Sequence, residues 1–193
     1  MTRPSPLHRV PALVRWTQRL ESNRALDGPV RGLEPLATVL LADERRSDAL
    51  RRMGLGHAIH PLLTDVPIGA WASATVLDLF GGEQSRFAVR RLVGILAAVP
   101  TAITGVAEWG PTETREKRVG VVHAMSNSIA LGLYTASWLS RRRGRHGRGA
   151  GLALAGAAAT GFGGYLGGQL IEARKVPIRH PAYDDAVTGR SRP

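Results

Sequence analysis

The chain has 193 residues, a formal net charge of +11 and no cysteine. This length suits one domain with a polar extension at each end. The absence of cysteine excludes disulfides, thiolate catalysis, cysteine-ligated zinc and iron–sulfur clusters. Most of the positive charge comes from arginines that flank apolar stretches, without interleaved aromatic residues for base stacking. A lipid surface is therefore favoured as a partner, and no nucleic acid is expected.

Residues 1–55 predict a basic, amphipathic, helical leader. In 10–22, apolar residues such as Val10, Leu13 and Val14 alternate with arginines, and 33–53 passes from an apolar half into a charged one. Both stretches are too charged to cross a membrane, so a solvated position and a position along the membrane interface are both open. The first residues lack the apolar core of a cleavable signal peptide.

Four apolar stretches follow and predict an all-α bundle of four transmembrane helices. Their ranges are about 61–82, 88–109, 119–140 and 149–171. The membrane domain then covers 56–173, and a polar tail covers 174–193. The first stretch carries two acids near its ends, Asp65 and Asp78. We expect Asp78 to pair with one of three nearby cations, Arg86, Arg90 or Arg91.

Small residues recur at every fourth position of the last stretch. One row consists of Gly151, Ala155, Ala159, Gly163 and Gly167. A second row, one position later, consists of Leu152, Gly156, Thr160, Gly164 and Gly168. Rows of small residues let helix backbones approach closely in lipid, so we expect tight packing of this helix.

An even number of spans places both termini on one side of the membrane, which we call face A. The loop 140–148 on the other side contains five arginines: Arg141, Arg142, Arg143, Arg145 and Arg148. By the positive-inside rule that side is cytoplasmic and the termini are outside. We therefore expect a multi-pass protein of the cell membrane, although the arginine-rich leader would then have to cross it.

Polar residues gather at face A if the helices rise about 1.5 Å per residue. On this count Asp65 and His123 lie roughly 6 Å inside face A, and Gln169 lies roughly 3 Å inside it. Asn127 follows His123 by one turn on the same helix face. The same face continues, and is expected to point inward, through Ala130, Tyr134 and Ser137.

Two neutral imidazoles from different helices can serve as the axial ligands of a b-type haem. His60 and His123 are the candidates, and Asp65 or Asn127 would fix the tautomers of their rings. The structural alternative for His123 is a neutral imidazole that forms a hydrogen bond between two helices. For His60 it is a helix N-cap before Pro61.

A metal site built from histidine and carboxylate side chains is the competing hypothesis. Its candidate ligands are His57, His60, His123 and Glu108. No phosphate loop, acid pair or nucleophile with an adjacent base is recognisable, so we expect no catalytic residues.

Residues 56–71 read G-H-x-x-H-P-L-L-T-D-x-P-I-G-A-W. This run resembles the signature of a predicted bacterial membrane-protein family, the domain of unknown function number 2231. The similarity continues through 77–78, 107–109, 118–127, 134–142 and 163–170. The resemblance implies a four-span bundle and, because some relatives are fused to a Rieske-type iron–sulfur domain, a redox setting. This chain has no cysteine for such a domain, and it has Gln169 where relatives often have histidine.

We therefore expect a non-enzymatic accessory or scaffold component in a redox setting, surrounded by the lipid bilayer. A Rieske-type or other redox protein, or a second copy of the chain, is the expected partner. One alternative is an electron-transfer subunit that binds haem b or a metal ion at the non-cytoplasmic face. The other is proton or ion conduction through Asp65, His123 and Gln169.

Overall fold

All regular secondary structure is helical in the part of the chain that the computed structural model describes, residues 10–51, 55, 57–80 and 84–176. Three shorter helices come first: α1 (Ala12–Ser22), α2 (Asp27–Leu41) and α3 (Glu44–Arg51). Four long helices follow: α4 (His60–Phe80), α5 (Gln84–Trp109), α6 (Thr114–Arg142) and α7 (His146–Gly168). The predicted all-α class is confirmed.

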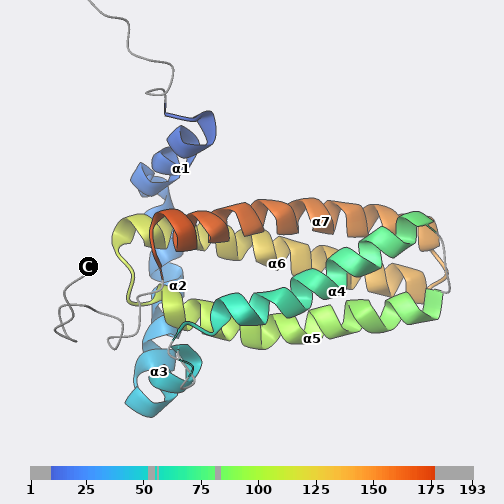
Figure 1. Cartoon of the computed structure of the whole chain (residues 1–193), viewed down its shortest axis with the longest axis horizontal. Coiled ribbons are helices and arrows are strands. Elements are labelled where there is room, and N and C mark those ends of the chain that lie inside the picture. Colours follow the sequence, from blue (N-terminus) through green and yellow to red (C-terminus); the bar gives the residue numbers. More distant parts are fainter. Residues whose placement is uncertain (1–9, 52–54, 56, 81–83, 177–193) are drawn as a thin grey trace, which may run out of the picture.

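The four long helices lie side by side, and the three short helices cross one end of this bundle (Figure 1). Because the connections between the long helices are short, consecutive helices run in opposite directions. The end that carries the short helices is face A, where α4 and α6 begin and α5 and α7 end. There α1 packs against α6, and α3 packs against α5.

Several helix ends differ from the predicted spans: α5 and α7, for example, begin at Gln84 and His146 instead of 88 and 149. α6 begins at Thr114, so the charged residues 115–118, predicted as a loop, belong to its start. Glu116 in this first turn suits the positive end of the helix dipole. After Gly168 the chain forms a π-helical turn, η3 (Gln169–Ala173), instead of continuing α7 as predicted.

Only one stretch of the described helices, Arg90–Trp109 in α5, is long and apolar enough to cross a membrane by length and composition alone. The sequence had predicted four such helices. α4 carries two aspartates, α6 contains histidine, asparagine and serines, and α7 consists largely of glycine and alanine. These compositions lower the hydropathy of the three helices relative to α5.

Glycines of α7 allow its extensive contact with α6. A Cβ atom added at Gly156 would lie 2.9 Å from the ring of Tyr134, and one added at Gly163 would lie 2.5 Å from Oδ1 of Asn127. At both positions a larger side chain of α6 therefore occupies the space that a side chain of α7 would need.

These close contacts follow the predicted rows of every fourth residue only in part: Gly163 and Gly167 of one row both contact α6, whereas Gly149 belongs to neither row. The contacting glycines Gly149, Gly156 and Gly163 are seven residues apart, whereas a Cβ atom at Gly151 or Gly164 would meet nothing within 4 Å. A seven-residue spacing keeps one face of a helix against its partner over several turns. The prediction of close packing through small residues is thus correct, but the repeat is different.

Polar side chains of α6 also bind the main chain of α7. The hydroxyl of Ser137 donates to the carbonyl of Gly149 at 2.6 Å, and the hydroxyl of Ser126 donates to the carbonyl of Ala159 at 2.8 Å. Such bonds satisfy polar groups away from water and join the two helices.

An aromatic pair links α4 to α6 near the middle of the bundle. Trp71 stacks on Tyr134 with ring centroids 4.6 Å apart and an interplanar angle of 13°. The hydroxyl of Tyr134 lies 3.1 Å from that of Thr75, with which it shares a hydrogen bond. Ala130 and Tyr134 are buried, so the predicted inward face of α6 is confirmed.

A buried ion cluster joins three helices at the end opposite face A. Asp78 of α4 pairs with Arg91 of α5, one of the three partners predicted, and with Arg141 of α6 at 2.6 Å. The side chains of Asp78 and Arg91 are 7% and 1% exposed. Since an unpaired buried charge is strongly destabilising, the pairing with Asp78 offsets part of the cost of burying Arg91.

The leader is held to face A by an apolar cluster. Val30 and Ala37 of α2 are buried together with Trp109 of α5 and Val121 of α6. The indole N–H of Trp109 donates to the carbonyl of Lys117 at 3.0 Å, so the ring is also fixed to the start of α6.

Ion pairs add to this docking. Lys117 binds Glu34 at 3.0 Å, and Arg118 binds Asp27 at 2.7 Å. The hydrogen bond from Arg118 holds the pKa of Asp27 below its usual value. This contribution to docking is therefore complete at neutral pH and is lost as the pH falls through that lowered pKa.

We predict that Gly156→Ala destabilises the bundle by about 1–3 kcal/mol, because the new methyl group overlaps Tyr134, whose ring is held by Trp71. Gly151→Ala is the matched control, because the same change on the same helix meets open space. Unfolding of the purified protein by sodium dodecyl sulfate, followed by circular dichroism, measures both. Equal stability of the two variants would contradict the glycine contact.

Candidate functional site

His60 lies at the start of α4, and its polar atoms are bound by α5. The ring Nδ1 lies 2.9 Å from the carbonyl oxygen of Thr101. A carbonyl can only accept, so Nδ1 carries the proton and donates. The hydroxyl of Thr104 lies 3.4 Å from the same nitrogen. His60 was predicted as an N-cap, but it is the first helical residue of α4, and Ile59 precedes it and accepts the first helical hydrogen bond from Leu63.

The carboxylate of Glu108 is a second contact between α5 and the start of α4. Its Oε1 accepts a hydrogen bond from the main-chain N–H of His60 at 3.1 Å, and the residue is 6% exposed. The first N–H groups of a helix have no partner within the helix and need an acceptor from elsewhere. Glu108 therefore acts as an N-terminal cap supplied by a neighbouring helix.

His123 of α6 is bound on both ring nitrogens. Nδ1 donates to the carbonyl of Gly163 on α7 at 2.7 Å. Nε2, which has no proton in this tautomer, accepts from the side-chain amide of Asn127 at 3.0 Å. Asn127 contacts this ring, as predicted, but it occupies the nitrogen that a haem would need, and the histidine links two helices.

The two histidines form a pair at the centre of face A. Their ring centroids are 6.4 Å apart and the rings are edge to face, at 85°. A Cβ atom at Gly105 of α5 would lie 2.8 Å from the ring of His60, and one at Gly167 of α7 would lie 3.0 Å from that of His123. The pair therefore occupies a space that all four long helices enclose.

Three other candidate residues lie apart from the histidine pair. His57 and Asp65 are exposed, so Asp65 does not orient either ring. The amide of Gln169 donates instead to Glu21 of the leader at 3.2 Å. Asp65, His123 and Gln169, expected to form a conduction path, thus have different surroundings.

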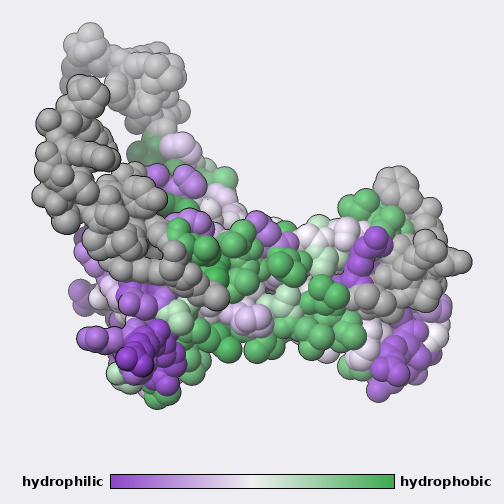
Figure 2. Space-filling model, turned by 60° about the horizontal axis from the view of Figure 1, so that its bottom comes forward, coloured by the Kyte–Doolittle hydropathy of each residue, from purple (hydrophilic) through white to green (hydrophobic). Residues whose placement is uncertain are grey.

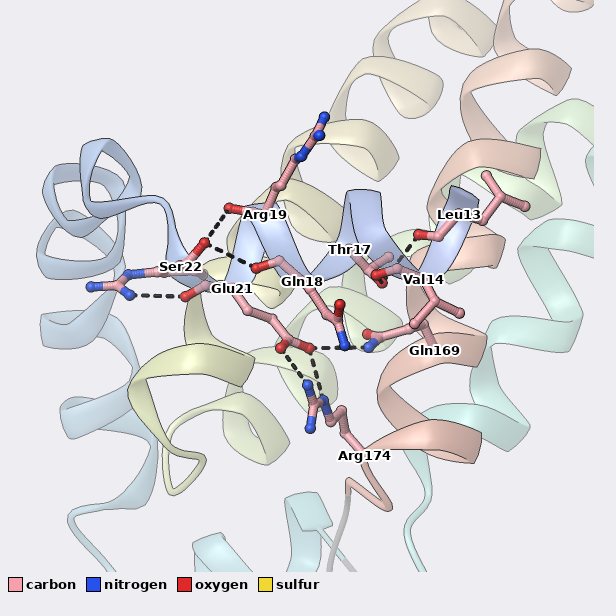
Figure 3. Close-up of polar contacts among 10 residues, drawn as sticks. Leu13, Val14, Thr17, Gln18, Arg19, Glu21, Ser22, Gln169 and Arg174 are labelled. Atoms are coloured by element: carbon pink, nitrogen blue, oxygen red, sulfur yellow. Dashed lines mark hydrogen bonds and ion pairs between the residues drawn. The ribbon is translucent and has the colours of Figure 1, made fainter. Parts of the chain in front are cut away.

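Glu21 belongs to a polar cluster that the sequence prediction missed. Its carboxylate accepts hydrogen bonds from Arg174 and Gln169, and its carbonyl accepts one from Arg118 at 2.8 Å. Figure 3 shows Glu21 pointing from α1 toward Gln169 and Arg174. The bond to Glu21 raises the pKa of Arg174. The one signal in the sequence was a glutamate on an otherwise apolar face of α1.

The glycines around the histidines were predicted only in part. Gly163 and Gly167 belong to one of the predicted rows of small residues, but Gly105 and the threonines of α5 gave no signal. Their roles depend on which side of α5 faces α4, and this orientation is set by packing.

The distance between the centroids of the two rings is close to the distance expected for two imidazoles that bind one metal ion. Two imidazoles bound to opposite sides of one ion, through bonds of about 2 Å, would have ring centroids about 6 Å apart. As the side chains lie, however, Nε2 of His123 is occupied by Asn127. The residues present therefore do not fit a bis-histidine haem unless Asn127 releases that nitrogen.

The other predicted site was a metal ion held by histidine and carboxylate side chains together. Within the described ranges, no group of three or more histidine, cysteine, aspartate or glutamate side chains is arranged to hold a metal ion. Of the four predicted ligands, His60, His123 and Glu108 lie in one cluster, and His57 lies outside it.

We predict that His123→Ala lowers the free energy of unfolding by about 1–3 kcal/mol, because it leaves the Gly163 carbonyl and the Asn127 amide without their partner. His57→Ala, which removes an exposed ring, should change it by less than about 0.5 kcal/mol. Thermal unfolding in detergent, followed by circular dichroism, compares the two. An unchanged midpoint for His123→Ala would show that the ring is not a structural link.

Residues 56–179 match the family described as "Predicted membrane protein (DUF2231)". The match spans the four long helices and both members of the histidine pair. No curated protein and no solved structure matches the chain. Since the match covers more than half of its length, the chain belongs to the DUF2231 family of predicted membrane proteins.

Proposed function

We propose that the protein is a non-enzymatic accessory component of the cell membrane, in which all four long helices cross the bilayer. The observation that carries this proposal is the distribution of side chains on the bundle, with apolar groups outside and bonded polar groups inside. Trp71, Tyr134 and small apolar residues are buried inside as well, but the exposed apolar surface is not that of a soluble helical bundle.

Large apolar side chains are exposed on each of the four helices. They include Val66 and Val76 on α4, Leu96 and Val99 on α5, Met125 and Ile129 on α6, and Leu154 and Phe162 on α7. Figure 2 shows hydrophobic residues over the middle of the bundle and hydrophilic residues at both ends of the face in view. Contiguous exposed apolar surface between two polar ends supports contact with lipid.

The polar groups inside the bundle have structural partners. Ser126, Ser137 and His123 bind carbonyls of α7, and His60 and Glu108 join α4 to α5. This network accounts for part of the lower hydropathy of α4 and α6, whereas Asp65 and Ser128 of the same helices are exposed. It supports a structural role for the cluster at face A.

Labelling of single cysteines tests the four crossings, and the chain has no native cysteine to interfere. We expect Val66→Cys, Leu96→Cys, Ile129→Cys and Leu154→Cys, one on each long helix, to resist a water-soluble maleimide in membranes and to react after denaturation. Reaction of the α6 and α7 variants in intact membranes, with protection of Leu96→Cys, would show that α5 alone crosses.

Two exposed positions test the proposed orientation. The arginines of the loop after α6 favour a cytoplasmic location for that loop. In intact cells an impermeant maleimide should then label Arg115→Cys at face A, and it should label Arg143→Cys only after permeabilisation. The opposite pattern would place the leader in the cytoplasm.

A second candidate is a ligand role for the histidine pair, which the 6.4 Å ring separation favours. Haem binding by this pair can be tested with a reduced-minus-oxidised visible spectrum of protein that is expressed with a haem supply. Bands lost in both His60→Ala and His123→Ala, and retained in His57→Ala, would establish a bis-histidine haem. A folded, colourless protein would exclude it. The redox protein and the second copy of the chain, which the sequence predicted as partners, remain predictions.

A further inference from the structure

The first helix is attached to the bundle by only part of its length. Its C-terminal half is fixed through Glu21, which binds Arg174 and Gln169, and through the Glu21 carbonyl, which binds Arg118. Trp16 contacts two aromatic rings of α7, with centroids 5.6 Å from Phe162 and 6.4 Å from Tyr165. The helix therefore has a defined position at the edge of face A, beside α7.

One face of α1 continues beyond the bundle. Leu13, Thr17 and Glu21 are four residues apart, and Val14 is three residues before Thr17, so the four lie on one side of the helix. Thr17 and Glu21 are 2% and 5% exposed, whereas Leu13 and Val14 are 60% and 40% exposed. The face that packs on the bundle at one end is thus apolar and uncovered at the other.

The surroundings of this uncovered face indicate what would cover it. It adjoins Trp16 and Phe162, and Phe162 is itself an exposed apolar residue of α7. The exposed apolar residues of α1 and the exposed Phe162 of α7 thus lie on either side of Trp16. In addition, α1 runs across the end of the bundle, so that its axis would lie along a membrane surface that the bundle crosses (Figure 1).

The opposite face of α1 is basic. Arg15 and Arg19 are each two residues from Thr17 and so lie on the other side of the helix. Figure 3 shows Arg19 pointing away from the side on which Glu21 binds Arg174. An apolar face, a basic face and a tryptophan between them are typical of a helix that lies in the headgroup region of an anionic membrane.

We infer that α1 is an interfacial helix, whose Leu13 and Val14 insert into the lipid leaflet beside α7 while its arginines contact anionic headgroups. The inference depends on the proposed crossing of the bundle, since the leaflet must meet the bundle at face A. The occupant of the exposed face is then lipid, and not a second protein chain.

Spin labels on single cysteines in the full-length protein test this arrangement. Leu13→Cys and the matched control Arg19→Cys, on opposite sides of one helix, are reconstituted in vesicles of phosphatidylcholine and phosphatidylglycerol. We expect the Leu13 label to be severalfold more accessible to oxygen, which concentrates in lipid, than to a water-soluble nickel chelate. The Arg19 label should show the reverse preference.

A third label, on Leu96→Cys in α5, reports separately whether the bundle is in the bilayer. If this label is lipid-exposed while the Leu13 and Arg19 labels are equally exposed to nickel, the inference is overturned and the membrane bundle stands. If the Leu96 label is exposed to nickel, both fail. Protection of the Leu13 label from both reagents, with spin–spin broadening, would show that a second copy covers α1 and would also overturn the inference.

Discussion

The arrangement of the bundle depends on the part of the α7 backbone that faces α6, where there are no bulky side chains. Gly149, Gly156 and Gly163 expose the carbonyl groups and leave space for side chains of α6. Because of this space, Ser137 and His123 can reach main-chain acceptors on α7. Two helices that would have little hydrophobic reason to associate in lipid are thus joined by close packing and by hydrogen bonds.

The same physical rule accounts for the cluster at face A. Three buried polar groups there are bound to main-chain groups of another helix: the ring of His60 to Thr101, the ring of His123 to Gly163, and the carboxyl group of Glu108 to the start of α4. A buried polar group without a partner is costly, so such a set is stable only when it is complete. A ligand that bound Nε2 of His123 would have to replace the hydrogen bond from the side-chain amide of Asn127.

The polar interior also explains why composition alone identifies one membrane-crossing stretch. Hydropathy averages the inner and outer faces of a helix, and α4 and α6 carry several polar residues on the inner face, among them Thr75, Ser126 and Ser137. At the two ends of the bundle, charges have different roles. The Asp78 cluster joins three helices internally, whereas Glu21, Asp27 and Glu34 hold the leader across face A.

The sequence by itself determined the four long helices, their order and the inward face of α6, because each of these depends on local periodicity and on the charges that separate apolar stretches. It did not determine the leader, where α2 and α3 replace the single predicted helix 33–53. It also determined that Asp78 would meet an arginine, since few other cations were within reach. Only the tertiary structure decided that Glu108 caps a helix that begins 48 residues earlier, that Asp65 is exposed, and that Glu21 binds Arg174 at a separation of 153 residues. These contacts depend on the rotation of each helix about its own axis. That rotation is set by the fit of Gly105, Gly163 and Gly167 against neighbouring side chains. The local sequence does not specify which side chains of other helices these glycines will meet.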